Sequence, residues 1–501
     1  MLLALILVPT LAGFAMPLLR ATLLRRVLLV ATAVSHAAMT GFVALRWPDR
    51  PESILHGWLA LDAMGMLFLG ITSVLFLAAA VYAVGYLDRE AHDDPKEEFV
   101  EHTWFTNQPE ALFLACLLLF LGAMTAVTVS QHLGLIWVAV EATTLFSAPL
   151  IYFHKHHRSL EATWKYVLIC SVGIALALLG NFALAAALPR GGGEASLVLH
   201  EILEKAAALN PMWVKTAMLF LIVGYGTKMG LAPMHTWLPD AHSEAPSMVS
   251  ALLSGALLNC AFLGILRGHQ VCLGAGLGDF SRDLLVGFGL VSLAVAAVFI
   301  VGQTDFKRLL AYSSVEHMGI LALAAGLGGA YGMGLHAVNH SLTKGCLFLI
   351  AGNVLSVYQT KTIANVRGVL RRIPLSGVIW FAGFLAITGS PPFGVFFSEF
   401  SILRTAMDAH RGWVAAAFLG LLAIIFLGMS WLVLPMLQGR DDAKTADQAA
   451  GHHSPRPLTW WMLAPPAVLI LLVLALGLTV PTQLDSLLHE IAHALARKGA
   501  A

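Results

Sequence analysis

The stretch KMGLAPMHTWLPDAHSEAPSMVSALL, residues 228–253, decides the fold. It begins with Lys228, shortly after the apolar run Leu219–Val223, and Pro233, Pro239 and Pro246 interrupt what would otherwise be one helix. A lysine in hydrocarbon costs about 2.5–3.5 kcal/mol or more, so it normally faces an interior cavity. Proline removes backbone hydrogen bonds, and irregular backbone at membrane depth is tolerated only where it is buried or lines water. The stretch therefore predicts a charged, hydrated break inside a transmembrane bundle, as ion pathways require.

The composition around this stretch is that of an integral membrane protein. Of 501 residues, 58% are hydrophobic and 12% are charged, whereas a soluble domain carries roughly 25% charged residues. The formal net charge of +1 gives no reason to expect a nucleic-acid partner. Residues 1–19 lack a basic region and a cleavage motif, so we expect a first spanning helix rather than a signal peptide.

Apolar segments of about 20 residues, the length of one membrane crossing, follow one another along the whole chain. They predict an all-α integral membrane protein with about fourteen transmembrane helices, at 1–19, 24–46, 60–86, 110–130, 132–152, 162–188, 213–239, 247–267, 284–302, 308–327, 333–357, 375–406, 413–435 and 459–480.

An internal repeat divides this series of helices. Val140-Glu141 in the fifth helix echoes Val315-Glu316 in the tenth, and the break at Pro233 in the seventh echoes Pro391-Pro392 in the twelfth. An odd separation of five helices means that the two units are inverted, as in many transporters with broken helices. We expect two inverted five-helix repeats (helices 4–8 and 9–13), with helices 7 and 12 discontinuous. The expected domains are 1–109 (three N-terminal helices and an acidic loop), 110–268 (first repeat), 283–436 (second repeat) and 437–501 (polar loop, final helix and tail).

The distribution of Lys and Arg predicts the orientation in the membrane. Sixteen of these residues lie in loops after odd-numbered helices, ten lie on the opposite side and four lie within helices. Cytoplasmic loops carry the excess of Lys and Arg. With an even helix count, both termini are therefore expected on the outer side.

Glu141 and Lys228 are the expected charged pair of the first repeat. Burial disfavours the charged form of both, so in one cavity they would titrate together and exchange a proton. A structural acid capped by hydroxyls is the alternative for Glu141. His235 lies in the break after Lys228 and is assigned to the same path. Lys165 is also assigned to it, with a snorkelling surface lysine as the alternative.

The second repeat carries three titratable residues on one helix face. His336, His340 and Lys344 recur every four residues, which aligns them along the helix. We expect a hydrated proton relay there. The two histidines have a spacing that could bind a metal, but no Cys or carboxylate completes a site in the sequence, so no metal site is predicted.

Two further acids are expected in the same unit. Glu399 follows the Pro391-Pro392 break and is assigned to the end of the path, with an acid at the water interface as the alternative. Glu316 precedes His317 in the tenth helix. These two form either a second acid/base pair or the neighbours of bound water.

At this point the chain resembles a known family, the antiporter-like, proton-conducting membrane subunits of respiratory complex I, Mrp-type cation/proton antiporters and membrane-bound [NiFe] hydrogenases. The resemblance rests on residues 228–246, on the DFKRLLAYSS segment at 305–314 and on Pro391-Pro392-Phe393. Within the family, the segments 226–233 and 240–246 are most similar to the F subunit of hydrogenase-4-type complexes.

The resemblance implies roles by position. Glu141 and Lys228 match the functional ion pair, Lys344 matches the central lysine of the second half-channel, and Glu399 matches the terminal group. The chain departs from the family in the eighth helix, where relatives carry His or Lys but this sequence has Ser254 or Asn259. That departure leaves a gap without a titratable group. The chain also lacks the long lateral helix of the largest complex I subunit, which implies a middle position in a subunit row.

The expected function is a proton-translocating, antiporter-like subunit of a redox-driven complex of hydrogenase-4, formate hydrogenlyase or complex I type. A Na⁺/H⁺ antiporter (Mrp-type) subunit, or the membrane subunit of an inorganic-carbon uptake system, is the alternative. No CxxC pair occurs among the five cysteines, so no iron–sulfur site is expected in this chain. The resemblance implies a bacterial or archaeal cytoplasmic (inner) membrane, and membrane and peripheral partner subunits that carry NiFe and iron–sulfur clusters.

Overall fold

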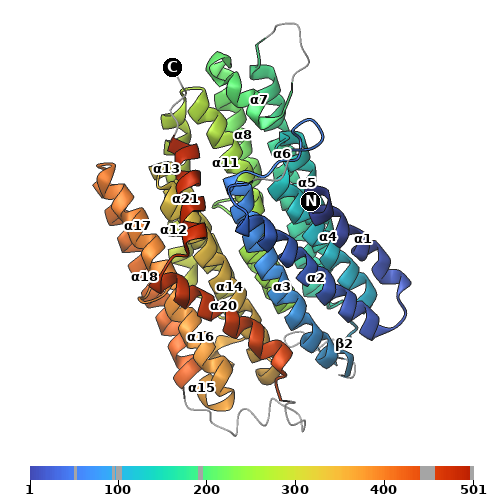
Figure 1. Ribbon diagram of the computed structural model, residues 1–501. Coiled ribbons are helices and arrows are strands. Elements are labelled where there is room, and N and C mark those ends of the chain that lie inside the picture. The colour runs from blue at the N-terminus through green and yellow to red at the C-terminus, as the bar shows by residue number, and fades with distance from the viewer. Residues whose placement is uncertain (50–52, 93–95, 98–103, 190–195, 440–456, 497–501) are drawn as a thin grey trace.

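The computed structural model is a bundle of long, closely packed helices (Figure 1). It describes residues 1–49, 53–92, 96–97, 104–189, 196–439 and 457–496. Among these residues, eleven helices are long and apolar enough to cross a membrane, and Leu2–Leu18 and Pro374–Ile387 are shorter apolar helices. The chain is therefore a multi-pass integral membrane protein, as the composition predicted.

The elements follow the apolar segments of the sequence. The N-terminal part contains α1 (Leu2–Ala15), η1 (Met16–Leu18), α2 (Thr22–Leu45), α3 (Ala63–His92), β1 (Lys96–Glu97), β2 (Trp104–Phe105), α4 (Glu110–Val129), α5 (Leu133–Ile151), α6 (His157–Ala187), α7 (Leu199–Glu204), η2 (Ala206–Ala208), α8 (Pro211–Met229), α9 (Leu238–Glu244), α10 (Ser247–Leu252), η3 (Leu253–Leu257) and α11 (Leu258–Gly274). The C-terminal part contains α12 (Gly278–Ile300), α13 (Phe306–Leu327), α14 (Ala330–Tyr358), η4 (Ile363–Asn365), α15 (Val369–Arg372), α16 (Pro374–Ile387), α17 (Gly394–Asp408), α18 (Gly412–Gln438), α20 (Trp460–Leu478) and α21 (Thr482–Ala496).

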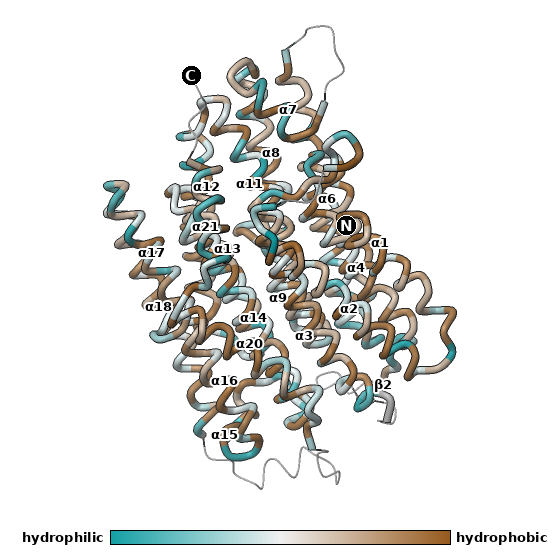
Figure 2. The backbone as a smooth tube through the Cα atoms, in the orientation of Figure 1, coloured by the Kyte–Doolittle hydropathy of each residue, from teal (hydrophilic) through white to brown (hydrophobic). Residues whose placement is uncertain are grey.

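Burial separates central helices from peripheral ones. The most apolar window of α13 is 100% buried, as is that of the Ser247–Gly274 segment, whereas the window of α18 is 28% buried. Helix α14 contacts α3, α10, α13, α16, α17, α20 and α21, so it forms the axis of the C-terminal half. The peripheral helices α16, α18 and α20 are largely hydrophobic along their length (Figure 2), as expected for a surface that meets lipid.

Both expected discontinuities occur, and local sequence explains each. Helix α8 ends where Gly230 adopts a left-handed conformation (φ 83°), and the chain resumes helix only at Leu238. Helix α16 ends before Gly389 (φ 65°), and α17 begins at Gly394. Left-handed backbone is accessible to glycine at little cost, and the following prolines cannot donate backbone hydrogen bonds. Each break therefore combines a glycine stop with prolines.

Two features differ from the sequence-based prediction. The eighth helix is interrupted by one π-helical turn, η3, which contains Ser254. The segment after residue 480, expected to be a tail, contains the amphipathic helix α21, which buries Leu487, Leu488 and Ile491. A 15-residue amphipathic helix escapes a search for apolar spans because only one of its faces is apolar. It packs against α14 and α3.

Candidate functional site

Lys228 is the centre of a polar network inside the N-terminal half. Its side chain is fully buried, and its Nζ donates to Thr144 Oγ1 at 2.8 Å and to the Tyr166 hydroxyl at 2.6 Å. The Tyr166 ring also lies under the ammonium group, 4.5 Å from Nζ to the ring centroid. An ammonium group has three donors, and two of them are thus satisfied by side chains of α5 and α6.

Glu141 is joined to Lys228 through a hydroxyl group. Thr144 Oγ1 donates to Glu141 Oε2 over 3.4 Å, and Ser171 Oγ donates to Glu141 Oε1 over 2.8 Å. The Thr144 hydroxyl therefore connects the two charged groups that the sequence paired. A chain of hydrogen bonds of this kind can pass a proton when each member donates in turn.

His235 lies in the break between α8 and α9. Its ring is 7% exposed, its Nδ1 has no hydrogen-bond partner among the described residues, and its ring centroid lies 6.0 Å from that of Tyr312. Buried polar atoms are usually paired, so an unpaired ring nitrogen at a helix break is an acceptor available to a proton or to water.

Lys165 lies in a different environment from the one predicted. Its side chain is 46% exposed and forms ion pairs with Glu161 at 2.7 Å and Asp240 at 3.0 Å. The assignment of Lys165 to the proton path therefore stays a prediction, and its half-exposed, ion-paired position favours the alternative of a snorkelling surface lysine. Tyr166, the next residue, points inward to Lys228 instead.

A hydroxyl bridge occupies the gap in the eighth helix. Ser254, in the π-helical turn, lies 2.8 Å from Ser314, hydroxyl to hydroxyl. Ser314 Oγ donates to the Leu310 carbonyl at 3.2 Å, and Lys344 Nζ donates to the same carbonyl at 2.7 Å. Asn259 donates to Ser341 over 2.8 Å. The position without a titratable group is thus linked by hydrogen bonds to Lys344.

Lys344 itself is fully buried, and its surroundings are less well paired than those of Lys228. Glu316 interacts electrostatically with Lys344, and its Oε2 has no hydrogen-bond partner among the described residues, although it lies 4.0 Å from His317 Nε2. Both ring nitrogens of His340 are also unpaired there. Lys344, Glu316 and His340 therefore form a buried group with several unused acceptors.

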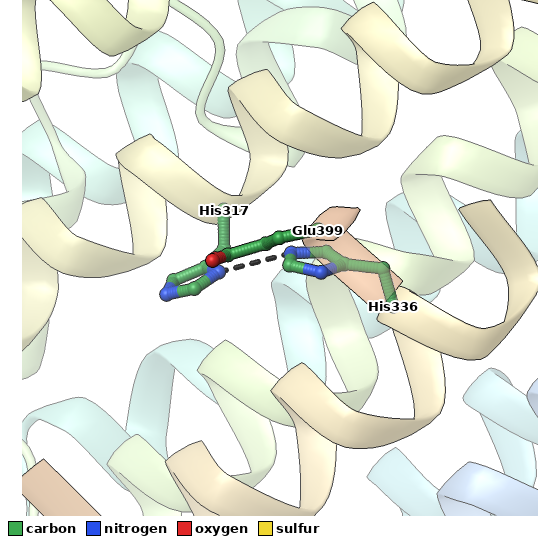
Figure 3. Close-up of side chains that lie close together, drawn as sticks. All are labelled: His317, His336 and Glu399. Atoms are coloured by element: carbon green, nitrogen blue, oxygen red, sulfur yellow. Dashed lines mark hydrogen bonds between the residues drawn. The ribbon is translucent and has the colours of Figure 1, made fainter. Parts of the chain in front are cut away.

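His317, His336 and Glu399 form a cluster contributed by three helices. His317 on α13 and His336 on α14 contact each other, with Nδ1 of His317 3.0 Å from Nε2 of His336. Figure 3 shows Glu399 of α17 pointing toward this pair. One ring nitrogen of each histidine and a carboxylate oxygen of Glu399 lie within 4.8 Å of one another. Sequence reasoning found no carboxylate for a histidine pair, because Glu399 is distant along the chain.

The two sequence motifs outside the path hold each other in place. Asp305 caps α13 by accepting from the Lys307 and Arg308 backbone N–H groups, and it also accepts from Ser243 Oγ at 2.6 Å. Arg308 Nη1 donates to Asp240 at 2.6 Å. The segments 240–246 and 305–314 therefore fix the broken helix of the first half against the second half.

Glu244 is the centre of an ion cluster beside this contact. It lies 2.8 Å from Lys361, 3.7 Å from Arg158 and 3.8 Å from His156. Burial alone would raise the pKa of Glu244, but the ion pair and hydrogen bond with Lys361, together with Arg158 and His156, lower it to about 2. The carboxylate is consequently a permanent anion at physiological pH.

The other side of the first half carries a second buried ion pair. Arg267 is fully buried, and its guanidinium donates two hydrogen bonds to the carboxylate of Asp62, at 2.6 and 2.7 Å. The geometry is bidentate, which makes such pairs strong and directional. The sequence analysis did not find this pair, since the two residues are 205 positions apart along the chain.

Taken together, the fold and these residues define a membrane protein in which buried Glu, Lys and His side chains form a series through the centre of the bundle. The chain matches the family described as NADH:quinone oxidoreductase/Mrp antiporter, TM over residues 130–425, and it belongs to that family.

Individual relatives agree with this membership. The chain is 36% identical to the Hydrogenase-4 component F homolog of Methylacidiphilum infernorum over 81% of this chain and 83% of that protein. It is 30% identical to NADH-quinone oxidoreductase subunit N of Deinococcus radiodurans, over 90% and 88%. A subunit of the Mrp complex from Dietzia sp. has the same fold, with a TM-score of 0.82, 20% identity and coverage of 99% and 97%. Some other curated relatives are longer, and this chain spans 54–56% of their length.

Proposed function

We propose that this chain is the proton-translocating, antiporter-like membrane subunit of a redox-driven complex of the hydrogenase-4 or formate hydrogenlyase type. The single observation that carries the proposal is the complete burial of two lysines in different halves of the bundle: Lys228, linked to Glu141 through the Thr144 hydroxyl, and Lys344, bonded to the Leu310 carbonyl. Buried ionisable residues in a membrane protein are costly, and they normally mark ion or proton pathways.

The proposed route begins at Glu141 and passes through the Thr144 hydroxyl to Lys228. It continues past His235 and across the hydroxyl bridge of Ser254 to Lys344. It then follows the acceptors in the second half to the terminal carboxylate, in the order Glu316, His340, His317, His336 and Glu399. Each titratable member can hold or release a proton, and the hydroxyls of Thr144, Ser254 and Ser314 can relay one. The Leu310 carbonyl shared by Ser314 and Lys344 only accepts, so a water molecule would have to carry the proton over that step.

The membrane arrangement belongs to the same proposal. It comprises fourteen crossings, two inverted repeats at 110–268 and 283–436, the flanking domains 1–109 and 437–501, and a location in a bacterial or archaeal inner membrane with both termini outside. Labelling a single cysteine at Gly499, which lies outside the described residues, with an impermeant reagent on intact cells tests the orientation. Labelling before lysis is expected, and protection until lysis contradicts it.

The redox cofactors are assigned to partner subunits. One relative of similar length is named a hydrogenase-4 component, which supports partners that carry NiFe and iron–sulfur clusters. Protons are preferred over Na⁺ as the transported ion, because hard cations take oxygen ligands whereas this path is built from lysine and histidine nitrogens as well as carboxylates. A Na⁺/H⁺ antiporter subunit remains the second candidate.

The test is proton uptake by liposomes that contain the purified complex with Lys228→Ala. Removing one member of a buried charged pair strands the other, so uptake should fall at least ~10-fold while the complex still assembles. Lys215→Ala, an exposed lysine at the other end of the same helix α8, is the matched control and should leave uptake unchanged. Normal uptake with Lys228→Ala would refute the proposal.

A further inference from the structure

The hydrogen-bond partners of His317 and His336 determine which ring nitrogens carry protons. His317 Nε2 lies 3.1 Å from the Ile387 carbonyl oxygen. A carbonyl oxygen only accepts, so Nε2 carries the proton in the neutral ring and Nδ1 is left with a lone pair.

The tautomer of His336 is likewise determined by its hydrogen-bond partner. Its Nδ1 lies 2.9 Å from Ser398 Oγ, and that hydroxyl donates its one proton to the Val395 carbonyl at 2.8 Å. The serine oxygen must then accept from the histidine, so His336 Nδ1 carries the proton and Nε2 is left with a lone pair.

The two lone pairs face each other. His317 Nδ1 and His336 Nε2 are the atoms separated by 3.0 Å, and both rings are fully buried. Two acceptors at that distance repel unless a cation lies between them. The carboxylate of Glu399 lies on the same site, and its Oε1 has no hydrogen-bond partner among the described residues.

We propose that His317 Nδ1, His336 Nε2 and the Glu399 carboxylate form a binding site for a divalent transition-metal ion such as Zn²⁺. Two imidazole nitrogens and one carboxylate are a ligand set that zinc accepts, at about 2.0–2.2 Å from each ligand atom. Tetrahedral geometry places two such nitrogens about 3.3 Å apart, close to the separation seen here. The Glu399 oxygen lies within 4.8 Å of both nitrogens, so coordination requires its side chain to rotate toward the ion.

The ring nitrogen of each histidine that faces away from the site is bonded as in metal-ligating histidines. Such histidines donate their other ring N–H to a carbonyl or another acceptor, which fixes the tautomer and the ring orientation. Here the Ile387 carbonyl is the acceptor for His317, and the Ser398 hydroxyl oxygen is the acceptor for His336. Other charged or titratable groups that face the site are Glu316, His340 and Lys344. The Glu316 carboxylate offsets the positive charge that a dication adds beside Lys344.

The experiment uses Co²⁺ as a coloured probe for the zinc site in the full chain, purified in detergent and freed of metal with a chelator. We expect one equivalent of Co²⁺ to give the visible absorption of a four-coordinate ion, and Zn²⁺ to displace it. His317→Gln, His336→Gln and Glu399→Gln should each weaken binding at least ~10-fold. His269→Gln is the matched control, because His269 is also buried but bonds to Ser281 instead.

His336→Cys provides a readout that a folding defect cannot produce. A thiolate ligand should add a charge-transfer band to the Co²⁺ spectrum while keeping the stoichiometry. Absence of the Co²⁺ absorption in the parent chain, or an unchanged spectrum in all three Gln variants, overturns the proposal. The cation between the two rings would then be a proton only.

Inhibition of proton uptake by Zn²⁺ is a second readout, and this one rests on the proposed function. We expect Zn²⁺ to stop uptake in liposomes containing the complex, and the His269→Gln complex to remain sensitive. Because the Co²⁺ titration involves no transport, a failure of metal binding leaves the proton-path proposal intact. Conversely, if proton uptake proves not to depend on this path, Co²⁺ binding would still establish the metal site.

Discussion

The two buried lysines have very different surroundings. Lys228 donates to the hydroxyls of Thr144 and Tyr166 and lies against the Tyr166 ring. Lys344 donates to a single backbone carbonyl, that of Leu310, and unpaired atoms of Glu316 and His340 lie in the same half. Both side chains are fully buried.

This difference indicates a division of labour between the two halves. A well-bonded ammonium group is held in one geometry, and moving its proton disturbs several partners at once. A group surrounded by unused acceptors can pass a proton with little rearrangement. Under the proposed function, the first half would gate the path and the second half would conduct and store protons.

The largest expected effect concerns the end of the second half. Glu399→Gln removes the terminal proton acceptor, so proton pumping in inverted vesicles should fall at least ~10-fold, with electron transfer in the partner subunits retained or partly slowed. Glu399→Lys should retain part of the pumping, since a lysine can also hold and release a proton. Pumping and turnover are measured on the same vesicles.

Comparing the two variants distinguishes loss of proton binding at residue 399 from a change in side-chain packing. Gln and Glu have nearly the same shape, so a loss seen only with Gln identifies the titrating carboxyl group. Full pumping with Glu399→Gln would mean that Glu399 is an interface acid and that the exit lies elsewhere.

A smaller effect is expected from Gly389→Ala at the second break. Gly389 has φ 65°, where an L-residue costs about 1–2 kcal/mol, and a Cβ there would collide with the Glu399 carboxylate. We expect the displaced carboxylate to lower pumping several-fold without preventing assembly. Gly412→Ala is the matched control, because a Cβ at Gly412 meets no atom within 4 Å. Equal pumping by both variants would show that the position of Glu399 is not critical.

The smallest effect on transport is expected from the ion cluster that lies outside both lysine sites. The pKa of Glu244 is lowered from 4.5 to about 2 by Lys361, Arg158 and His156, despite its burial. Its ion pairs therefore stabilise the folded chain fully above about pH 4.5, and this stabilisation is lost as the pH falls toward 2. The shift corresponds to roughly 3 kcal/mol. Thermal unfolding in detergent should show a steeper loss of stability from pH 6 to pH 3 in the parent chain than in Glu244→Gln.

Glu204→Gln, an exposed carboxylate on α7, serves as the control for the acid titration. It should follow the parent chain at every pH. If Glu244→Gln follows the parent chain as well, the cluster does not contribute to stability, and the contact between the segments 240–246 and 305–314 rests on its other bonds.

Sequence reasoning predicted the helical class and both breaks because their causes are local. Apolar length, glycine and proline act on neighbouring residues, so Gly230 and Pro233 end α8 whatever packs around them. The burial of Lys228 and Lys344 could also be predicted from the sequence, because each lysine occurs within an apolar helix.

The features that the sequence analysis did not predict depend on contacts between distant segments. The exposure of Lys165, the Asp62–Arg267 pair and the approach of Glu399 to His317 are set by packing of separate helices. The π-helical turn at Ser254 was not predicted, since a single Ser-Gly pair within an apolar helix does not specify a π-turn. The orientation of the two histidine lone pairs depends on carbonyl and hydroxyl partners that only the fold brings together.

In the proposed route, Lys228 and Lys344 serve one continuous path. Proton uptake per electron transferred, measured for the complex with Lys228→Ala, with Lys344→Ala and with both, tests it most directly. Two sites in series are strongly non-additive, so each single variant should lower uptake at least ~10-fold and the double variant should lower it no further. Two partial losses that add up in the double variant would show separate, parallel paths and would contradict the account.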